Sequence, residues 1–417
     1  MRVASTGNRL GVRVSVVALA FAGIACGGSG AGGGAKEPEA GEQGESGDLT
    51  AQFEREAGPL EKHAVKAEGA FTATIEGKAP PKVERSEKSW SITVDVGWGG
   101  SELQCLVYDD VIDPGTAAYA MVKAAAKDVN FKALAPYFLE HLGLEPILGI
   151  RGLYHVERDG TLLAGDIKLA VLARSERPMA CWHDAPGYAK AFARVTSEFA
   201  KSFQFQRSEP APMRAELWAM TMEDVPIGFT REAAYLLEDG TLRKVSLGAR
   251  FLPAGPGEMA FEDEVQVLAF DKDGTLATGK YMSIENGETN LNIDVEKTKA
   301  GYNYVGTIQG KEVKGSFKTK TPIKVQRAVE NKLKAAGKNK KKAKFEQWEY
   351  HPSLDASKGT LVSYEVTPES EGMSILTSVG KRSATLKADP RGVVGQVMFG
   401  VGSRQLKLQL LEEAGEP

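Results

Sequence analysis

The sequence predicts an α+β protein in two parts. The first is an α/β sandwich with a mostly antiparallel sheet, and the second is an antiparallel β-rich curved sheet or half-barrel with one inserted helix. Three observations lead there. Strand-like runs and helical stretches mix between residues 51 and 207; from residue 213 strand follows strand; and one helical, lysine-rich segment at 322–344 interrupts that series.

The part of the 417-residue chain that follows the tether is too long for a single hydrophobic core, so two domains are expected. Pro210-Ala211-Pro212 marks the boundary between them. We therefore divide the chain into a leader at residues 1–26, a tether at 27–50, a sandwich domain at 51–207 and a β-rich domain at 213–417.

In the sandwich domain, strand-like runs cover residues 70–75, 90–96 and 103–108. Asp113 and Pro114 are typical of a helix start and predict a helix over 116–127. We expect a second helix over 131–142, and a short helix or an ordered lead-in over 48–68.

Two further strands, 150–157 and 162–173, are joined by an Asp-Gly pair at 159–160, which favours a tight hairpin. After a short strand reaching Cys181, a last helix carries an apolar stripe at helical spacing, formed by Tyr188, Phe192, Val195, Phe199 and Phe203. This stripe is interpreted as core and not as a ligand site.

In the β-rich domain, turns are expected at Asp239-Gly240, Asp273-Gly274 and Asn286-Gly287. Leu291, Ile293 and Val295 alternate with polar residues, as one dry and one wet face of a sheet require. A long sheet of this kind must curl or pair to hide its dry face, and we expect the inserted helix to cover it.

The leader carries Arg2, Arg9 and Arg13, then an apolar run that ends at Cys26. The run is too short to span a bilayer. It resembles the lipobox of bacterial lipoproteins, which implies that Cys26 is diacylated and anchors the chain in a membrane. The alternative is an ordinary secretory signal cleaved nearby. The Gly/Glu-rich residues 27–50 are typical of a flexible tether, and Gly27 after the cysteine implies sorting to the outer membrane, facing the periplasm or the cell surface.

Cys105 and Cys181 are the remaining cysteines, and in an oxidising envelope they are expected to form a disulfide. Two alternatives stay open: a functional thiol at Cys181, next to His183 and Asp184, or two unpaired cysteines in the core.

The sequence contains no catalytic motif, no histidine pair at metal-ligand spacing and no phosphate-binding loop. We therefore predict no catalytic residue, no metal and no cofactor. Without the leader, which carries three of the 52 basic residues and no acid, the formal net charge is 49 − 55 = −6, which argues against nucleic acid as a partner. Among the charged segments, Lys338, Lys340, Lys341 and Lys342 could contact anionic head groups; the alternative is a solvated loop at a helix end.

The order of elements at 70–205 faintly resembles PsbP-like and Mog1-like domains. The strands at 213–412 resemble the half-barrels of the LolA/LolB type, whose concave face holds acyl chains, and a β-rich domain found beside transglutaminase-like modules. No functional residue carries over. The sequence thus predicts a lipid-anchored envelope protein that binds a lipid or another apolar ligand without catalysis. The alternatives are a structural or accessory subunit of an envelope protein complex and, more distantly, a thiol enzyme using Cys181.

Overall fold

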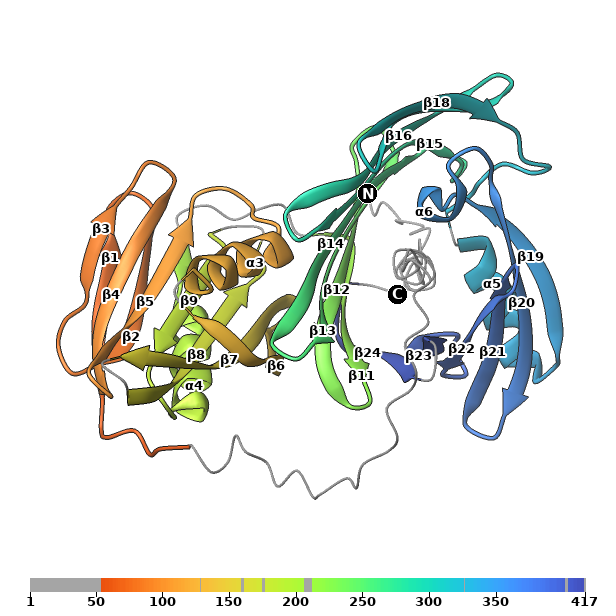
Figure 1. Ribbon diagram of the computed structural model, residues 1–417. Helices are drawn as coiled ribbons and strands as arrows, with labels where there is room; N and C mark the ends of the chain where they lie inside the picture. Colours follow the sequence, from red (N-terminus) through yellow and green to blue (C-terminus); the bar gives the residue numbers. More distant parts are fainter. Residues whose placement is uncertain are drawn as a thin grey trace, which may run out of the picture.

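The computed structural model describes residues 54–127, 129–158, 161–174, 177–205, 212–325, 327–401 and 404–415. Over these residues the chain forms antiparallel sheets of three, seven and fourteen strands, with four helices (Figure 1). The prediction of a β-rich, antiparallel protein is therefore confirmed in its coarse form. The leader, the tether and Cys26 lie outside the described residues. We call residues 54–205 the N-terminal part and residues 212–415 the C-terminal part.

The N-terminal part contains the two smaller sheets. The three-stranded sheet has the order β1 (Glu61–Ala67), β2 (Phe71–Gly77), β10 (Gln204–Phe205). The seven-stranded sheet has the order β3 (Lys82–Arg85), β4 (Ser89–Trp98), β5 (Ser101–Tyr108), β9 (Met179–Asp184), β8 (Thr161–Leu172), β7 (Glu145–Arg158), β6 (Asn130–Leu142).

Helix α4 (Ala189–Lys201) lies between these two sheets and packs on β2 and β8. Its side chains Phe192, Val195 and Phe199 are fully buried in a core that both sheets share. The apolar stripe of this helix is thus core, as predicted. Helix α3 (Pro114–Ala125) packs on the other face of the seven-stranded sheet, against β8.

The helix predicted over residues 131–142 is wrong, because these residues form the edge strand β6. Pro136 in its middle cannot donate the backbone hydrogen bond that a helix interior needs. In a strand the same proline is tolerated at an irregularity, and the register against β7 shifts between Pro136 and Phe138. The conformation of residues 131–142 is decided by their pairing with β7. No local sequence pattern predicts this pairing.

The segment 48–68, expected as a short helix or an ordered lead-in, forms strand β1 over Glu61–Ala67 and no helix in its described residues. In β1, Val65 and Ala67 are buried while Lys62 and Lys66 are exposed, an alternation that fits a half-buried strand. All residues of β1 pair with β2.

The C-terminal part is one sheet of fourteen strands. Its order is β18 (Lys311–Phe317), β17 (Gly301–Ile308), β16 (Glu288–Thr298), β15 (Leu276–Glu285), β14 (Glu258–Phe270), β13 (Leu242–Gly255), β12 (Val225–Leu236), β11 (Arg214–Met222), β24 (Arg404–Gly415), β23 (Val394–Val401), β22 (Arg382–Ala388), β21 (Gly372–Val379), β20 (Thr360–Glu369), β19 (Ala343–Glu349). Its first and last strands, β11 and β24, pair in the middle of the sheet.

All three predicted turns join neighbouring strands of this sheet. Asp239-Gly240 lies between β12 and β13, Asp273-Gly274 between β14 and β15, and Asn286-Gly287 between β15 and β16. Asn286 and Gly287 have φ angles of 51° and 78°, which Asn and Gly tolerate best in a two-residue hairpin.

The sheet curls so that its concave face surrounds two helices, α5 (Arg327–Asn339) and the single turn α6 (Pro352–Asp355) (Figure 1). Helix α5 lies in the segment between the edge strands β18 and β19 and packs on β19 and β20. The helix predicted within 322–344 is therefore present, whereas the sequence did not indicate α6.

The two parts share a hydrophobic core. Helix α3 packs against β14 of the large sheet as well as against β8. The buried side chains of this core come from both parts and include Ala118, Leu148, Phe229, Phe251 and Phe261. The convex face of β12–β14 is thereby covered, over part of its length, by the N-terminal part.

Candidate functional site

Alternate residues of each strand point toward the concave face of the large sheet. Along the sheet, these residues form three zones of different character. In the first zone, strands β20–β24 present apolar residues such as Val362, Ile375 and Val397. These pack on Val329, Leu333 and Ala336 of α5. This zone is filled by side chains.

The second zone is the apolar and aromatic face of β15–β18. Leu291, Ile293 and Val295 are buried there, as their alternation predicts. Tyr350, just after β19, belongs to the same cluster as Phe317 at the end of β18. The edge strands of the sheet therefore meet through side chains.

The third zone, in the middle of the sheet, is charged. Arg250 of β13 forms ion pairs with Glu262 and Glu264 of β14, at 2.6 and 2.7 Å. Lys244 pairs with Glu232 at 2.7 Å. All five side chains are buried. Buried charges are strongly destabilising unless they are paired. Each of these charged side chains therefore needs its ion-pair partner on the neighbouring strand. The sequence predicted a dry, apolar face for the large sheet, but strands β12–β14 carry these charged side chains on the concave face.

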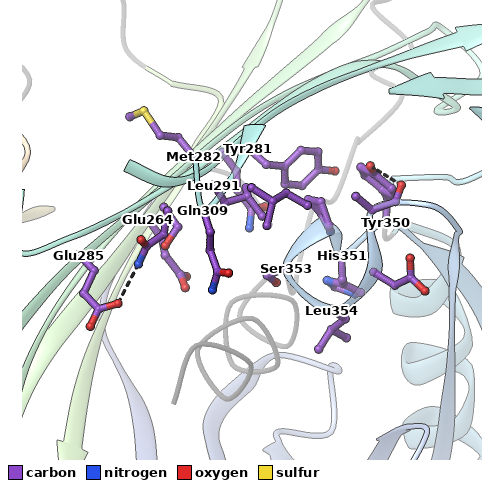
Figure 2. A pocket seen from close by; sticks show the side chains of 17 residues that line it. Glu264, Tyr281, Met282, Glu285, Leu291, Gln309, Tyr350, His351, Ser353 and Leu354 are labelled. Carbon is purple, nitrogen blue, oxygen red and sulfur yellow. Dashed lines mark hydrogen bonds between the residues drawn. The ribbon is translucent and has the colours of Figure 1, made fainter. Parts of the chain in front are cut away.

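A pocket of about 720 Å³ lies where the second and third zones meet. Strands β14–β17 form one wall, and the segment from Tyr350 through α6 forms the other (Figure 2). The apolar lining consists of Tyr281, Leu291, Ile308, Tyr350, Pro352, Leu354 and Ala356, and the polar lining of Glu264, Gln266, Ser283, Glu285, Asn290, Gln309, His351, Ser353 and Asp355. Met282 lies on the same wall, but its side chain points away from the pocket (Figure 2).

Some polar groups of the pocket are already occupied. The side-chain amide of Asn290 donates to Glu285 at 2.7 Å. Glu264 accepts from Arg250, and burial raises the pKa of the Glu264 carboxyl. The hydroxyl of Ser357 and the ammonium of Lys358 lower the pKa of Asp355 to about 2.

Other polar groups remain open to a ligand. Among the described residues, the side chains of Gln266, Ser283 and Gln309 make no hydrogen bond, yet all three face the pocket. Amide and hydroxyl groups both donate and accept, so they can bind hydroxyl or ester groups of a ligand.

His351 is held by Glu349, whose other carboxylate oxygen accepts from Tyr364. The His351 Nε2 lies 3.0 Å from Glu349, and the Tyr364 hydroxyl donates at 2.8 Å. In the described part of the chain, no hydroxyl or thiol donates to this imidazole. The arrangement lacks the nucleophile–base pair on which covalent catalysis depends.

The structure joins Cys105 and Cys181 in a disulfide, which confirms that prediction. The two residues face each other on the adjacent antiparallel strands β5 and β9. Because its sulfur is bonded, Cys181 lacks the thiolate that a nucleophile requires. His183 is fully buried next to Trp98, and burial lowers its pKa to about 4.

The predicted lysines Lys338, Lys340, Lys341 and Lys342 lie at the end of α5 and just beyond it. All four side chains are exposed. Within the described residues none of them forms an ion pair, so their charge faces solvent. They take no part in the pocket.

Reasoning from the sequence missed the pocket because its walls come from opposite ends of the sheet. Tyr350 and His351 follow β19, while Leu291 and Ile308 belong to β16 and β17. The one local signal was the Tyr-His-Pro run at 350–352, which carries polar and aromatic groups beside a helix start.

No group of acidic, histidine or cysteine side chains in the described ranges has the geometry to hold a metal ion. Among those ranges, too, no helix combines the length and the apolar character needed to cross a bilayer.

Comparison with known proteins adds little. No protein-family model matches the chain. No curated protein matches it either. One solved structure, a beta-barrel-like protein of the domain of unknown function DUF1849 from Brucella abortus, aligns over 51% of this chain and 100% of its own, with 9% identity and a TM-score of 0.38. A structure from Bacteroides thetaiotaomicron aligns over 35% of this chain and 48% of its own, with 15% identity and a TM-score of 0.21.

Proposed function

We propose that this chain is a lipid-anchored protein of the bacterial envelope that binds an amphipathic ligand in the concave pocket and catalyses no reaction. The observation that carries the proposal is the pocket of about 720 Å³, which falls within the range of small-molecule sites. Its walls are divided between apolar and polar side chains, which suits a ligand with an apolar and a polar end.

The charges of the pocket narrow the ligand class. Glu264, Glu285 and Asp355 are acidic, and His351 is the single basic side chain in the lining. Glu264 is paired with Arg250 and Asp355 with Lys358, and Glu285 forms no ion pair among the described residues. Because no arginine or lysine lines the pocket to bind an anion, a neutral or cationic amphiphile is favoured over a fatty acid or a phosphate. This refines the apolar ligand expected from the sequence, and the resemblance to LolA/LolB half-barrels remains part of the proposal.

Lipid analysis of the purified full chain tests this proposal. Leu291→Trp would place an indole in the pocket, whereas Val305→Trp places the same ring on the exposed side of the adjacent strand β17. We expect one ligand to be extracted at a near-equal molar ratio from the wild type and from Val305→Trp. It should be lost from Leu291→Trp. Equal amounts of every lipid in all three proteins would refute the proposal.

The anchor at Cys26 has its own test, which does not depend on the pocket. Labelled palmitate fed to the producing cells should enter the wild-type chain and not Cys26→Ser. The variant should also leave the membrane fraction if acylation holds it there. Unchanged labelling of Cys26→Ser would exclude this residue as the acylation site.

A second function, that of a structural or accessory subunit, is favoured by the first zone of the concave face. There the side chains of α5 fill the space that a ligand would need. A stable envelope partner that protects the outer surfaces from cross-linking, combined with an empty pocket, would support this function over ligand binding.

A further inference from the structure

A second concavity lies on the convex face of the large sheet, opposite the pocket described above. The N-terminal part covers this face over a cluster that includes Phe229, Ala249, Phe251 and Phe261, with Leu247 packed at the edge of the cluster. Beyond them the face is left open as a groove of about 770 Å³. Its lining is formed by Val111, Asp113, Arg174, Met213, Arg231, Ala233, Tyr235, Leu236, Leu237, Arg243, Val245, Leu247, Val265 and Met282.

The floor of the groove is apolar across three strands. Ala233 of β12 faces Val245 of β13 in the sheet register. Leu247 of β13 faces Val265 of β14. All four residues line the groove, so a continuous apolar surface crosses the sheet from β12 to β14.

The rim of the groove exposes large apolar side chains. Val111, Leu236 and Leu237 are 64%, 49% and 44% exposed, and together they make up three of the seven exposed large apolar residues in the described chain. Exposed apolar residues that cluster at one concavity are typical of a binding site, whereas single exposed apolar residues scattered over a surface are not. The apolar floor and rim of the groove therefore suit the binding of an apolar chain.

Arg231 is the charged side chain of the groove that could bind the polar end of a ligand. Its Nε is buried and has no hydrogen-bond partner. Among the described residues, no carboxylate forms an ion pair with its guanidinium. A buried donor without a partner is destabilising, and in native proteins such a group calls for a specific explanation. Arg231 as a whole is half-buried and its terminal nitrogens are not among the buried groups, so an anionic ligand in the groove can pair with them and neutralise the guanidinium charge.

The other charges of the groove leave a positive surplus. Arg243 lies across from Tyr235 and is exposed, with no ion pair in the described ranges. Arg174 is already paired with Glu145. Asp113 is the single acid in the lining, and burial raises its pKa. From Arg231 to Tyr235, which lie on the same face of β12, the strand extends about 13 Å. The groove continues beyond Tyr235 to Leu237, so it has room for a long alkyl chain.

We propose that this groove binds a long-chain fatty acid, with its carboxylate on Arg231 and its alkyl chain along Ala233, Val245 and Tyr235. A free fatty acid fits better than a membrane surface, because Val111, Asp113 and Arg174 of the N-terminal part wall the groove and a flat bilayer would not enter it. The concave pocket offers a carboxylate no such partner, because no arginine or lysine lines it.

Palmitate binding to the full chain, carrying Cys26→Ser so that no acyl chain is attached, tests the proposal. Displacement of a fluorescent fatty acid measures the affinity. Arg231→Met keeps an unbranched apolar side chain and removes the charge, while Arg391→Met is the control, since Arg391 is exposed and pairs with Asp389 in the turn before β23. We expect Arg231→Met to weaken palmitate binding at least tenfold and Arg391→Met to leave it unchanged.

Two further measurements separate this role from general loss of structure and from membrane docking. Methyl palmitate has no charge, so it should bind the wild type and Arg231→Met equally and more weakly than palmitate binds the wild type. Leu291→Trp should not alter palmitate binding, which distinguishes this site from the concave pocket. The proposal is overturned if Arg231→Met binds palmitate as the wild type does. It is also overturned if phosphatidylglycerol vesicles bind the groove in an Arg231-independent manner while free palmitate does not bind.

Discussion

The ring of Tyr350 stacks on the ring of Phe317, with centroids 4.9 Å apart and planes 13° from parallel. Phe317 is the last residue of β18, and Tyr350 directly follows β19, so the contact joins the two edge strands of the fourteen-stranded sheet. Tyr281 meets the ring of Tyr350 edge-on at 5.4 Å. Because Tyr281 and Tyr350 also line the pocket, closure of the sheet and the shape of the pocket depend on one aromatic cluster.

Phe317→Ala should therefore destabilise the protein more than its position on an edge strand suggests. The ring is buried, and its removal leaves a cavity between the two edges of the sheet. We expect the free energy of unfolding to fall by about 3 kcal/mol. Urea denaturation measures this, with Leu361→Ala as the control, because Leu361 is 39% exposed on β20. Equal losses for both variants would show that the aromatic contact does not hold the edges together.

The parts of the fold that the sequence predicted correctly rest on local signals. Gly240, Gly274 and Gly287 lie in hairpin turns where positive φ angles are required. The spacing of Phe192, Val195 and Phe199 shows the buried face of α4 without knowledge of its partners. Such signals are independent of the rest of the chain, so they can be interpreted residue by residue.

The parts that could not be predicted depend on pairing between distant segments. Residues 131–142 form a strand because β7 pairs with them, and their own pattern does not select between strand and helix. The charges of Arg250 and Glu264 are buried because the register of β13 and β14 brings them together. Considered without their partners, charged residues such as Arg250 and Glu264 would be predicted to lie on the protein surface. The pocket has the same origin, since its walls are far apart in the chain.

The disulfide between Cys105 and Cys181 should contribute strongly to stability. It closes a loop with a sequence separation of 76 residues, which restricts the unfolded chain. Chain entropy alone predicts a contribution of about 4 kcal/mol. The double variant Cys105→Ala, Cys181→Ala should lose this amount in guanidinium denaturation. Dithiothreitol should destabilise the wild type and leave the double variant unaffected. A wild type that is insensitive to the reductant would contradict the prediction.

The lysines at 338, 340, 341 and 342 should increase binding to anionic membranes if they contact head groups. Each lysine close to such a surface contributes about 1 kcal/mol, and salt weakens the effect. Co-sedimentation of the full chain with phosphatidylglycerol vesicles should decrease when all four are replaced by Gln. The matched control replaces the exposed lysines Lys311, Lys314, Lys318 and Lys320, which lie on the edge strand β18 or just after it. The same decrease in both variants would mean that the segment is only a solvated loop.

Asp263 of β14 caps helix α3 and so links the two parts of the chain. Its carboxylate accepts from the backbone N–H groups of Gly115 and Thr116, at 2.6 and 2.7 Å, and from the Thr116 hydroxyl at 2.9 Å. Asp113, which the sequence placed at the N-cap, makes no side-chain capping bond. The cap is thus supplied by a residue 148 positions away from Gly115.

The capping carboxylate should make stability depend on pH with a defined sign. Burial raises the pKa of Asp263 from 3.8 to about 6 in the folded state. Between these values the folded chain binds more protons than the unfolded chain, so the contribution of Asp263 to stability is present below pH 4 and is lost as the pH rises to about 6. The loss amounts to about 3 kcal/mol.

Comparison with Asp263→Asn isolates this contribution, because the amide keeps one acceptor oxygen and does not titrate. The difference in free energy of unfolding, wild type minus variant, should decrease as the pH rises from 4 to 6 and stay constant above pH 7. Urea denaturation at each pH measures it, and Asp239→Asn is the control, because Asp239 is exposed and the hydroxyl of Thr241 lowers its pKa. A difference that increases over the same interval would show that hydrogen bonding to the ionised cap outweighs the cost of burying its charge.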